Sequence, residues 1–216
     1  MSQIPPAGTP AKEFFERFVP EAFAANPIPD DAKQVDVMLG VRLEGDGGGE
    51  WRFHLKQGEL QVAPGATEDA AFTVIQSVVD WRGALWEGRG GPVGRLSQTI
   101  FQSGAGGGAS GGASAPSVLG TLNALQALRG VIKMVVMGDK GGDWAVAVKL
   151  GPGPVPAQPT TTVSITADDA AALERGELDP MQAFMAGRIQ VAGDISLLMQ
   201  MQAAQMQAAA SQPGKA

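Results

Sequence analysis

The segment GDKGGDWAVAVKLG at residues 138–151 decides the fold, because a closely matching segment, GDGGGEWRFHLKQG, occurs at residues 45–58. Both follow the pattern G-D-x-G-G-acid-W-x-x-x-x-K-x-G without a gap, and the tryptophan and lysine stay in register with the glycines. A low-complexity segment would not keep that register. We therefore interpret the two segments as equivalent parts of a domain-sized internal repeat.

The periodicity around both segments is that of β-strands. Every second residue is apolar in residues 35–43, 51–55 and 144–148, as in a strand with one buried face. The Gly-Asp-rich residues before each tryptophan predict a hairpin turn, where glycine supplies positive φ angles. Further strands are predicted at residues 60–63, 71–76 and 162–166.

Each half then becomes helical, and the second half carries the clearer signals. Thr166 is a predicted helix cap, with Asp169 three residues later as in a capping box, and Gly176 ends the helix. Asp179 caps the next predicted helix, with Pro180 at its first position. After a stop at Gly187 come a short strand at 188–193 and a last helix at about 194–209 that begins at Asp194.

The repeat and the glycine content divide the chain into parts. Residues 103–117, SGAGGGASGGASAPS, predict a flexible linker between a degenerate half at 1–102 and a more complete half at 118–210. Residues 211–216 predict a disordered tail. The first half lacks a counterpart of 179–209, and GPGPVPAQP at 151–159 stands where the first half has a strand.

Composition argues against several functions. The 216 residues include no cysteine and one histidine, which makes a transition-metal site or a cysteine nucleophile improbable. The net charge of −6 argues against nucleic-acid binding. The N-terminus does not resemble a secretory signal, and no apolar run reaches the ~20 residues of a membrane span. We expect a soluble cytoplasmic protein without a metal or cofactor.

Motifs of catalysis are weak. GASGG at 108–112 matches G-x-S-x-G only inside the Gly/Ala/Ser segment, without the strand and helix that the motif needs. The turn at 45–50 precedes a strand and carries two acids, which disfavours phosphate binding. The acidic pairs at 30–31, 68–69 and 168–169 suit turns and helix caps. The sequence therefore predicts no catalytic residue and no enzyme.

The segment LERGELDPMQAFMAGRIQVAGDISLLMQMQ at 173–202 resembles the C-terminal signature of SCP-2-like (sterol carrier protein type-2) lipid-binding domains. The shared features are the Asp179-Pro180 helix start, Ala183-Phe184, the Met185-to-Arg188 turn and Gly193-Asp194. The resemblance covers about 130–210 well, and about 12–101 without the signature. It implies an α+β fold, with a curved, mainly antiparallel sheet, helices on one side and an apolar tunnel for acyl chains, sterols or other lipids. The repeat adds an internal duplication.

Two functions remain open. The first is a non-catalytic lipid-binding or lipid-transfer protein that holds a long-chain lipid, fatty acyl or isoprenoid ligand in a tunnel of the second half. The second is a scaffold or accessory protein with a closed core, for example in lipid or quinone metabolism, which docks on a partner through its C-terminal Met-rich helix. The predicted lipid-binding residues are Trp144, Val146, Val148, Val163, Ile165, Phe184, Met185, Ile195, Leu198, Met199 and Met201.

Overall fold

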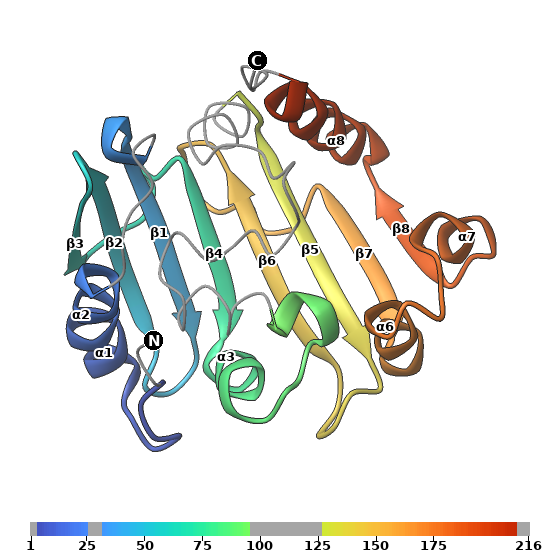
Figure 1. Cartoon of the computed structure of the whole chain (residues 1–216), viewed down its shortest axis with the longest axis horizontal. Coiled ribbons are helices and arrows are strands. Elements are labelled where there is room, and N and C mark those ends of the chain that lie inside the picture. Colours follow the sequence, from blue (N-terminus) through green and yellow to red (C-terminus); the bar gives the residue numbers. More distant parts are fainter. Residues whose placement is uncertain (1–3, 26–31, 96–126, 211–216) are drawn as a thin grey trace, which may run out of the picture.

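Strands from both halves of the chain join in one eight-stranded sheet, in the order β3-β2-β1-β4-β6-β5-β7-β8 (Figure 1). The structure is a computed structural model that describes residues 4–25, 32–95 and 127–210. The strands are β1 (Asp36–Glu44), β2 (Gly49–Lys56), β3 (Glu59–Pro64), β4 (Phe72–Ser77), β5 (Gly130–Met137), β6 (Trp144–Leu150), β7 (Thr161–Thr166) and β8 (Ile189–Gly193).

Helices lie on one face of this sheet (Figure 1). Most neighbouring strands are antiparallel, and the parallel pairs are β1–β4 and β5–β7. The predicted α+β fold with a mainly antiparallel sheet is therefore confirmed. The helical segments are α1 (Ala11–Glu13), the π-helix η1 (Phe14–Phe18), α2 (Val19–Ala24), the 3-10 helix η2 (Ala32–Gln34), α3 (Val78–Trp86), α6 (Ala167–Glu174), α7 (Pro180–Met185) and α8 (Ile195–Ala210). Residues 91–95 are helical as well.

The two halves share two strand pairings. In each half a hairpin comes first, β1–β2 or β5–β6, and its first strand then pairs in parallel with the next long strand, β4 or β7. Trp51 and Trp144 occupy the same place in these hairpins, opposite Val41 and Val136. The repeated sequence pattern thus coincides with a repeated pattern of hydrogen bonding.

The halves are joined between β4 and β6, which pair antiparallel with Val74 opposite Val148. In the first half the corresponding edge of β2 pairs with β3. Residues 151–159 contain no strand, in agreement with the inability of proline to donate to a sheet ladder. Because no β3-like strand occupies the edge of β6, β4 of the first half can pair there.

Strand β5 was not among the predicted strands. Its residues, GVIKMVVM, form a nearly continuous apolar run and not an alternating one. Val131 and Ile132 point to opposite faces, yet each is at most 5% exposed. A central strand that is covered on both faces has such a continuous apolar run. Periodicity alone does not distinguish this run from a buried helix segment, which is why β5 was not predicted.

The predicted helix boundaries of the second half agree with the structure. The Thr166 hydroxyl accepts from the backbone N–H of Asp169, and Asp179 accepts from that of Gln182. Gly176 and Gly187 have positive φ angles of 70° and 71°, which glycine adopts without strain. The predicted linker at 103–117 and tail at 211–216 lie outside the described residues.

Aromatic side chains fill the space between helices and sheet in the first half. Seven of the eight phenylalanines and three of the four tryptophans precede residue 103. Phe14 and Phe15 of η1 are both buried and contact Trp51 or Trp81, with ring centroids 4.8–5.5 Å apart. Such offset and edge-to-face contacts stabilise the packing of the rings. The described part of the first half therefore has an aromatic core.

Candidate ligand-binding site

An apolar pocket of about 200 Å³ lies on the helix-covered face of the sheet in the second half. Its floor comes from β5 and β7, and α6 forms one side. Every lining residue is apolar, without a single ionisable side chain. The lining residues are Gly90, Pro92, Val93, Met134, Val135, Val136, Val163, Ile165, Ala170, Leu173 and Ile189.

The side chains at this pocket are small or aliphatic, in contrast to the first half. Ala170 is 1% exposed and packs in a cluster with Val136 and Trp144. Among the described residues of the second half the one phenylalanine is Phe184, which is 42% exposed and does not line the pocket. The pocket can therefore receive an apolar group by van der Waals contact, and its lining side chains offer no group for proton transfer.

Two of the predicted lipid-binding residues, Val163 and Ile165, line this pocket. Trp144 and Val146 lie next to it, in the buried cluster of Ala84, Val136 and Ala170. Another three predicted residues lie in a separate cluster at the base of α8. These are Val148, Leu198 and Met201, which pack against Leu128, Ile132, Leu150 and Leu197.

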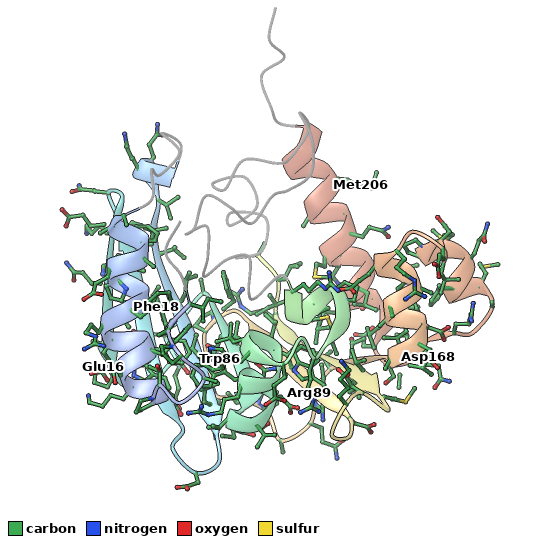
Figure 2. All side chains as sticks on the ribbon, turned by 60° about the horizontal axis from the view of Figure 1, so that its bottom comes forward. Glu16, Phe18, Trp86, Arg89, Asp168 and Met206 are labelled. Carbon is green, nitrogen blue, oxygen red and sulfur yellow. The ribbon has the colours of Figure 1, made fainter. Side chains whose placement is uncertain are left out.

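The remaining four predicted residues are exposed on α7 and α8. Phe184 is 42% exposed, Met185 79%, Ile195 44% and Met199 64%. Met181 and Met206 are exposed as well, and Figure 2 shows Met206 on the outer part of α8. The structure therefore does not bring these four residues into the pocket that Val163 and Ile165 line.

The first half also contributes residues that line the pocket, and the sequence did not predict them. Gly90, Pro92 and Val93 follow α3 in a glycine-rich segment, where neither hydrophobic period is present. Met134 and Val136 were missed because β5 was not predicted. Leu173 and Ile189 belong to elements that were predicted. The available signals were the i, i+3 spacing of Ala170 and Leu173 on α6 and the alternation of Ile189 with polar neighbours on β8.

The opposite face of the sheet carries a groove of different character. It has a volume of about 320 Å³ and lies between the sheet and residues 155–159. Glu44, Asp80 and Lys133 line it together with alanine and proline. Charged groups at the wall make this groove less suited to an alkyl chain than the pocket on the helix-covered face.

One buried cation lies on that opposite face. Lys149 is 3% exposed, and its Nζ donates to the carbonyl of Gly153 at 2.6 Å. Burial lowers the pKa of this lysine, and the nearby Glu68, Asp69 and Glu50 partly offset that effect. Lys149 thus fixes the 151–159 segment to the sheet, away from the apolar pocket.

Among the described residues, no group of three or more histidine, cysteine, aspartate or glutamate side chains is placed to hold a metal ion. Within the same ranges, no helix has the length and hydropathy of a transmembrane span.

The fold and the pocket define an α+β protein with an apolar cavity between a mainly antiparallel sheet and its helices. Residues 117–206 match the sequence model described as the SCP-2 sterol transfer family. "Sterol carrier protein 2" of Oryctolagus cuniculus is 35% identical over 83 residues, which are 37% of this chain and 14% of that protein. The chain thus spans a small part of that relative, and the second half of the chain is the part that is similar to SCP-2 domains.

Solved structures of sterol carrier proteins are also similar. One is a sterol carrier protein domain of Helicoverpa armigera, at 23% identity and a TM-score of 0.31, covering 50% of this chain and 99% of that one. Another is Sterol Carrier Protein 2 Like 2 of Aedes aegypti, at 22% identity and a TM-score of 0.27, covering 34% of this chain and 71% of that one.

Proposed function

We propose that this chain is a non-catalytic lipid-binding or lipid-transfer protein, and that its second half holds part of a long-chain lipid in the apolar pocket. The observation that carries the proposal is the contrast between the two halves. The described core of the first half is built from aromatic rings, whereas described residues, most of them from the second half, line a wholly apolar pocket of about 200 Å³. The similarity of residues 117–206 to the SCP-2 sterol transfer family supports the same function.

The size of the pocket limits what enters it. A methylene group occupies about as much space as a water molecule, ~30 Å³, so a volume of about 200 Å³ suits roughly seven of them. Transfer of seven methylenes from water is worth about 6 kcal/mol before the cost of association. The pocket therefore suits a segment of an acyl or isoprenoid chain, and the polar head group stays outside it.

The experiment is extraction of the purified full-length chain, followed by mass spectrometry of the extract and titration with the fluorescent fatty acid cis-parinarate. We expect a copurifying lipid and saturable binding of the probe. Val163→Phe fills the pocket and weakens binding, by about tenfold or more. Thr162→Phe is the matched control, because Thr162 precedes Val163 on β7 and faces the other side of the sheet. A chain that carries no lipid and binds no probe would contradict the proposal.

We also infer that the two halves are copies of one domain type, of which the first is degenerate. Equivalent strand pairings support this inference, as do equivalent helix starts: Ser77 accepts from Asp80 N–H as Thr166 accepts from Asp169 N–H. Each of these aspartates also pairs with an arginine that follows a positive-φ glycine. The distances are 3.7 Å for Arg89–Asp80 and 2.8 Å for Arg188–Asp169.

A scaffold or accessory role is the second candidate function, favoured by the exposed apolar side chains of α7 and α8. Met181, Met185 and Met199 are each more than 60% exposed. A double variant, Met185→Gln with Met199→Gln, separates the two functions, because neither residue lines the pocket. Loss of a copurifying protein with unchanged cis-parinarate binding would favour the scaffold role for this surface.

A further inference from the structure

We propose that the segment Arg89–Val93 of the first half is an essential wall of the ligand pocket, so that the degenerate half completes the site of the second. This proposal rests on the proposed lipid binding. Gly90, Pro92 and Val93 line the pocket opposite β5, β7 and α6 of the second half. The match to the SCP-2 sterol transfer family begins only at residue 117, so this wall lies outside the matched region.

Buried polar contacts hold the wall in place. Arg89 is 4% exposed, and its Nη2 donates to the carbonyls of Gly142 and Asp143 at 3.1 and 3.2 Å. The same nitrogen lies 3.7 Å from Oδ1 of Asp80 at the start of α3. Figure 2 shows Arg89 where the segment after α3 meets the β5–β6 hairpin. A buried guanidinium with such partners is costly to displace, so the segment is positioned firmly.

The next residue is held from the same hairpin. The backbone N–H of Gly90 donates to Oδ2 of Asp139 at 2.7 Å. Asp139 and Gly142 belong to the repeated G-D-x-G-G motif, in its second copy. The turn of the second half therefore has a function beyond reversing the chain, because it binds the segment that closes the pocket.

Close backbone packing then sets the position of Val93. A Cβ on Gly90 would lie 2.6 Å from the indole of Trp144, and one on Gly91 would lie 3.0 Å from Cβ of Ala170. Residues 91–95 are helical, and Val93 packs against the cluster of Val136, Trp144 and Ala170. Val93 is half-buried and lines the cavity, so its size decides how much of the volume is free.

The test uses full-length variants and titration with cis-parinarate. Val93→Phe extends a ring into the pocket, and we expect about tenfold weaker binding. Val79→Phe is the matched control, because Val79 lies on α3 of the same half, is 68% exposed and does not line the pocket. Thermal unfolding of each variant shows whether the fold is retained.

A second variant keeps the test decisive if Val93→Phe does not fold. Val93→Ala enlarges the pocket by two methyl groups. We expect the affinity for the methyl-branched phytanate, divided by the affinity for palmitate, to rise by about tenfold. If the wild-type chain binds cis-parinarate and neither Val93 variant changes any affinity, while Val163→Phe does, the wall is not part of the site. That outcome overturns this inference and leaves the proposed function intact, whereas a wild-type chain that binds nothing overturns both.

Discussion

Gly90 lies against the indole ring of Trp144, and this contact brings the first half of the chain onto the second. A Cβ on Gly90 would lie 2.6 Å from the ring, and the φ angle of Gly90 is +86°. The indole N–H of Trp144 in turn donates to the carbonyl of Asp80 at 2.8 Å. Trp144 is completely buried by these contacts, so any side chain at position 90 must displace it or the segment after α3.

The first prediction follows from this contact. Gly90→Ala should lower the free energy of unfolding by about 2–4 kcal/mol, since a positive φ angle costs alanine about 1–2 kcal/mol and the clash with Trp144 adds to it. Gly88→Ala is the matched control, because Gly88 also has a positive φ angle but has open space around it. Urea denaturation measures both. Equal losses in the two variants would mean that the indole contact contributes nothing.

The second prediction concerns the start of α6. The hydroxyl of Thr166 accepts from the N–H of Asp169 at 3.2 Å. Thr166→Ala removes this cap and should cost about 1 kcal/mol of unfolding free energy. Thr166→Ser keeps the hydroxyl and should retain most of that stability. The idea fails if alanine and serine are equally destabilising in chemical denaturation.

The third prediction is a pH dependence that arises from Lys149. Burial lowers the pKa of Lys149 in the folded chain from its usual 10.5. Between the folded and the unfolded pKa the unfolded chain binds more protons, so the free energy of unfolding rises with pH in that window. Below the folded pKa both states are protonated and the group adds no pH dependence.

Lys149→Met should remove this contribution. Urea denaturation from about pH 8 upward measures it, through the slope of the unfolding free energy against pH. We expect the slope of the methionine variant to be less positive than that of the wild type as the pH approaches 10.5. Identical slopes in the two proteins would contradict the effect of burial on Lys149.

The fourth prediction separates the two faces of α8. Leu197 is 3% exposed and packs with Leu128, Ile132 and Leu150, so Leu197→Ala should cost about 2–5 kcal/mol. Met199 is 64% exposed, and Met199→Ala should change stability by no more than about 0.5 kcal/mol. Thermal and urea unfolding compare the two variants. A large loss for Met199→Ala would show that its side chain is covered in solution.

Much of the fold is predictable from local patterns in the chain. The alternation around Trp51 and Trp144 predicts the β1–β2 hairpin and strand β6, and the signals at Thr166, Asp179 and Gly187 predict the helix boundaries of the second half. These signals are local, because capping, turn geometry and strand period each act over a few residues. Strand β5 has no such signal, since a strand that is covered on both faces loses its alternation.

The candidate site is less predictable. Val163 and Ile165 line the apolar pocket, whereas Met185 and Met199 are exposed although their apolar character is the same. An apolar helix position can face a cavity, a filled core or solvent, and the hydrophobic pattern alone does not distinguish these cases. The prediction that the four exposed residues bind lipid stays a prediction.

Residue order and residue type determine seven of the eight strands, the caps, the repeat and the apolar, cation-poor character of this protein, because each depends on interactions between near neighbours or on composition. The pairing of β4 with β6 and the position of Gly90 against Trp144 depend on tertiary structure. Both contacts join residues more than fifty positions apart. The first needs a free edge on β6, and the second needs a residue without a side chain beside Trp144; only the folded chain provides both. The pocket exists for that reason, since neither half supplies all of its walls.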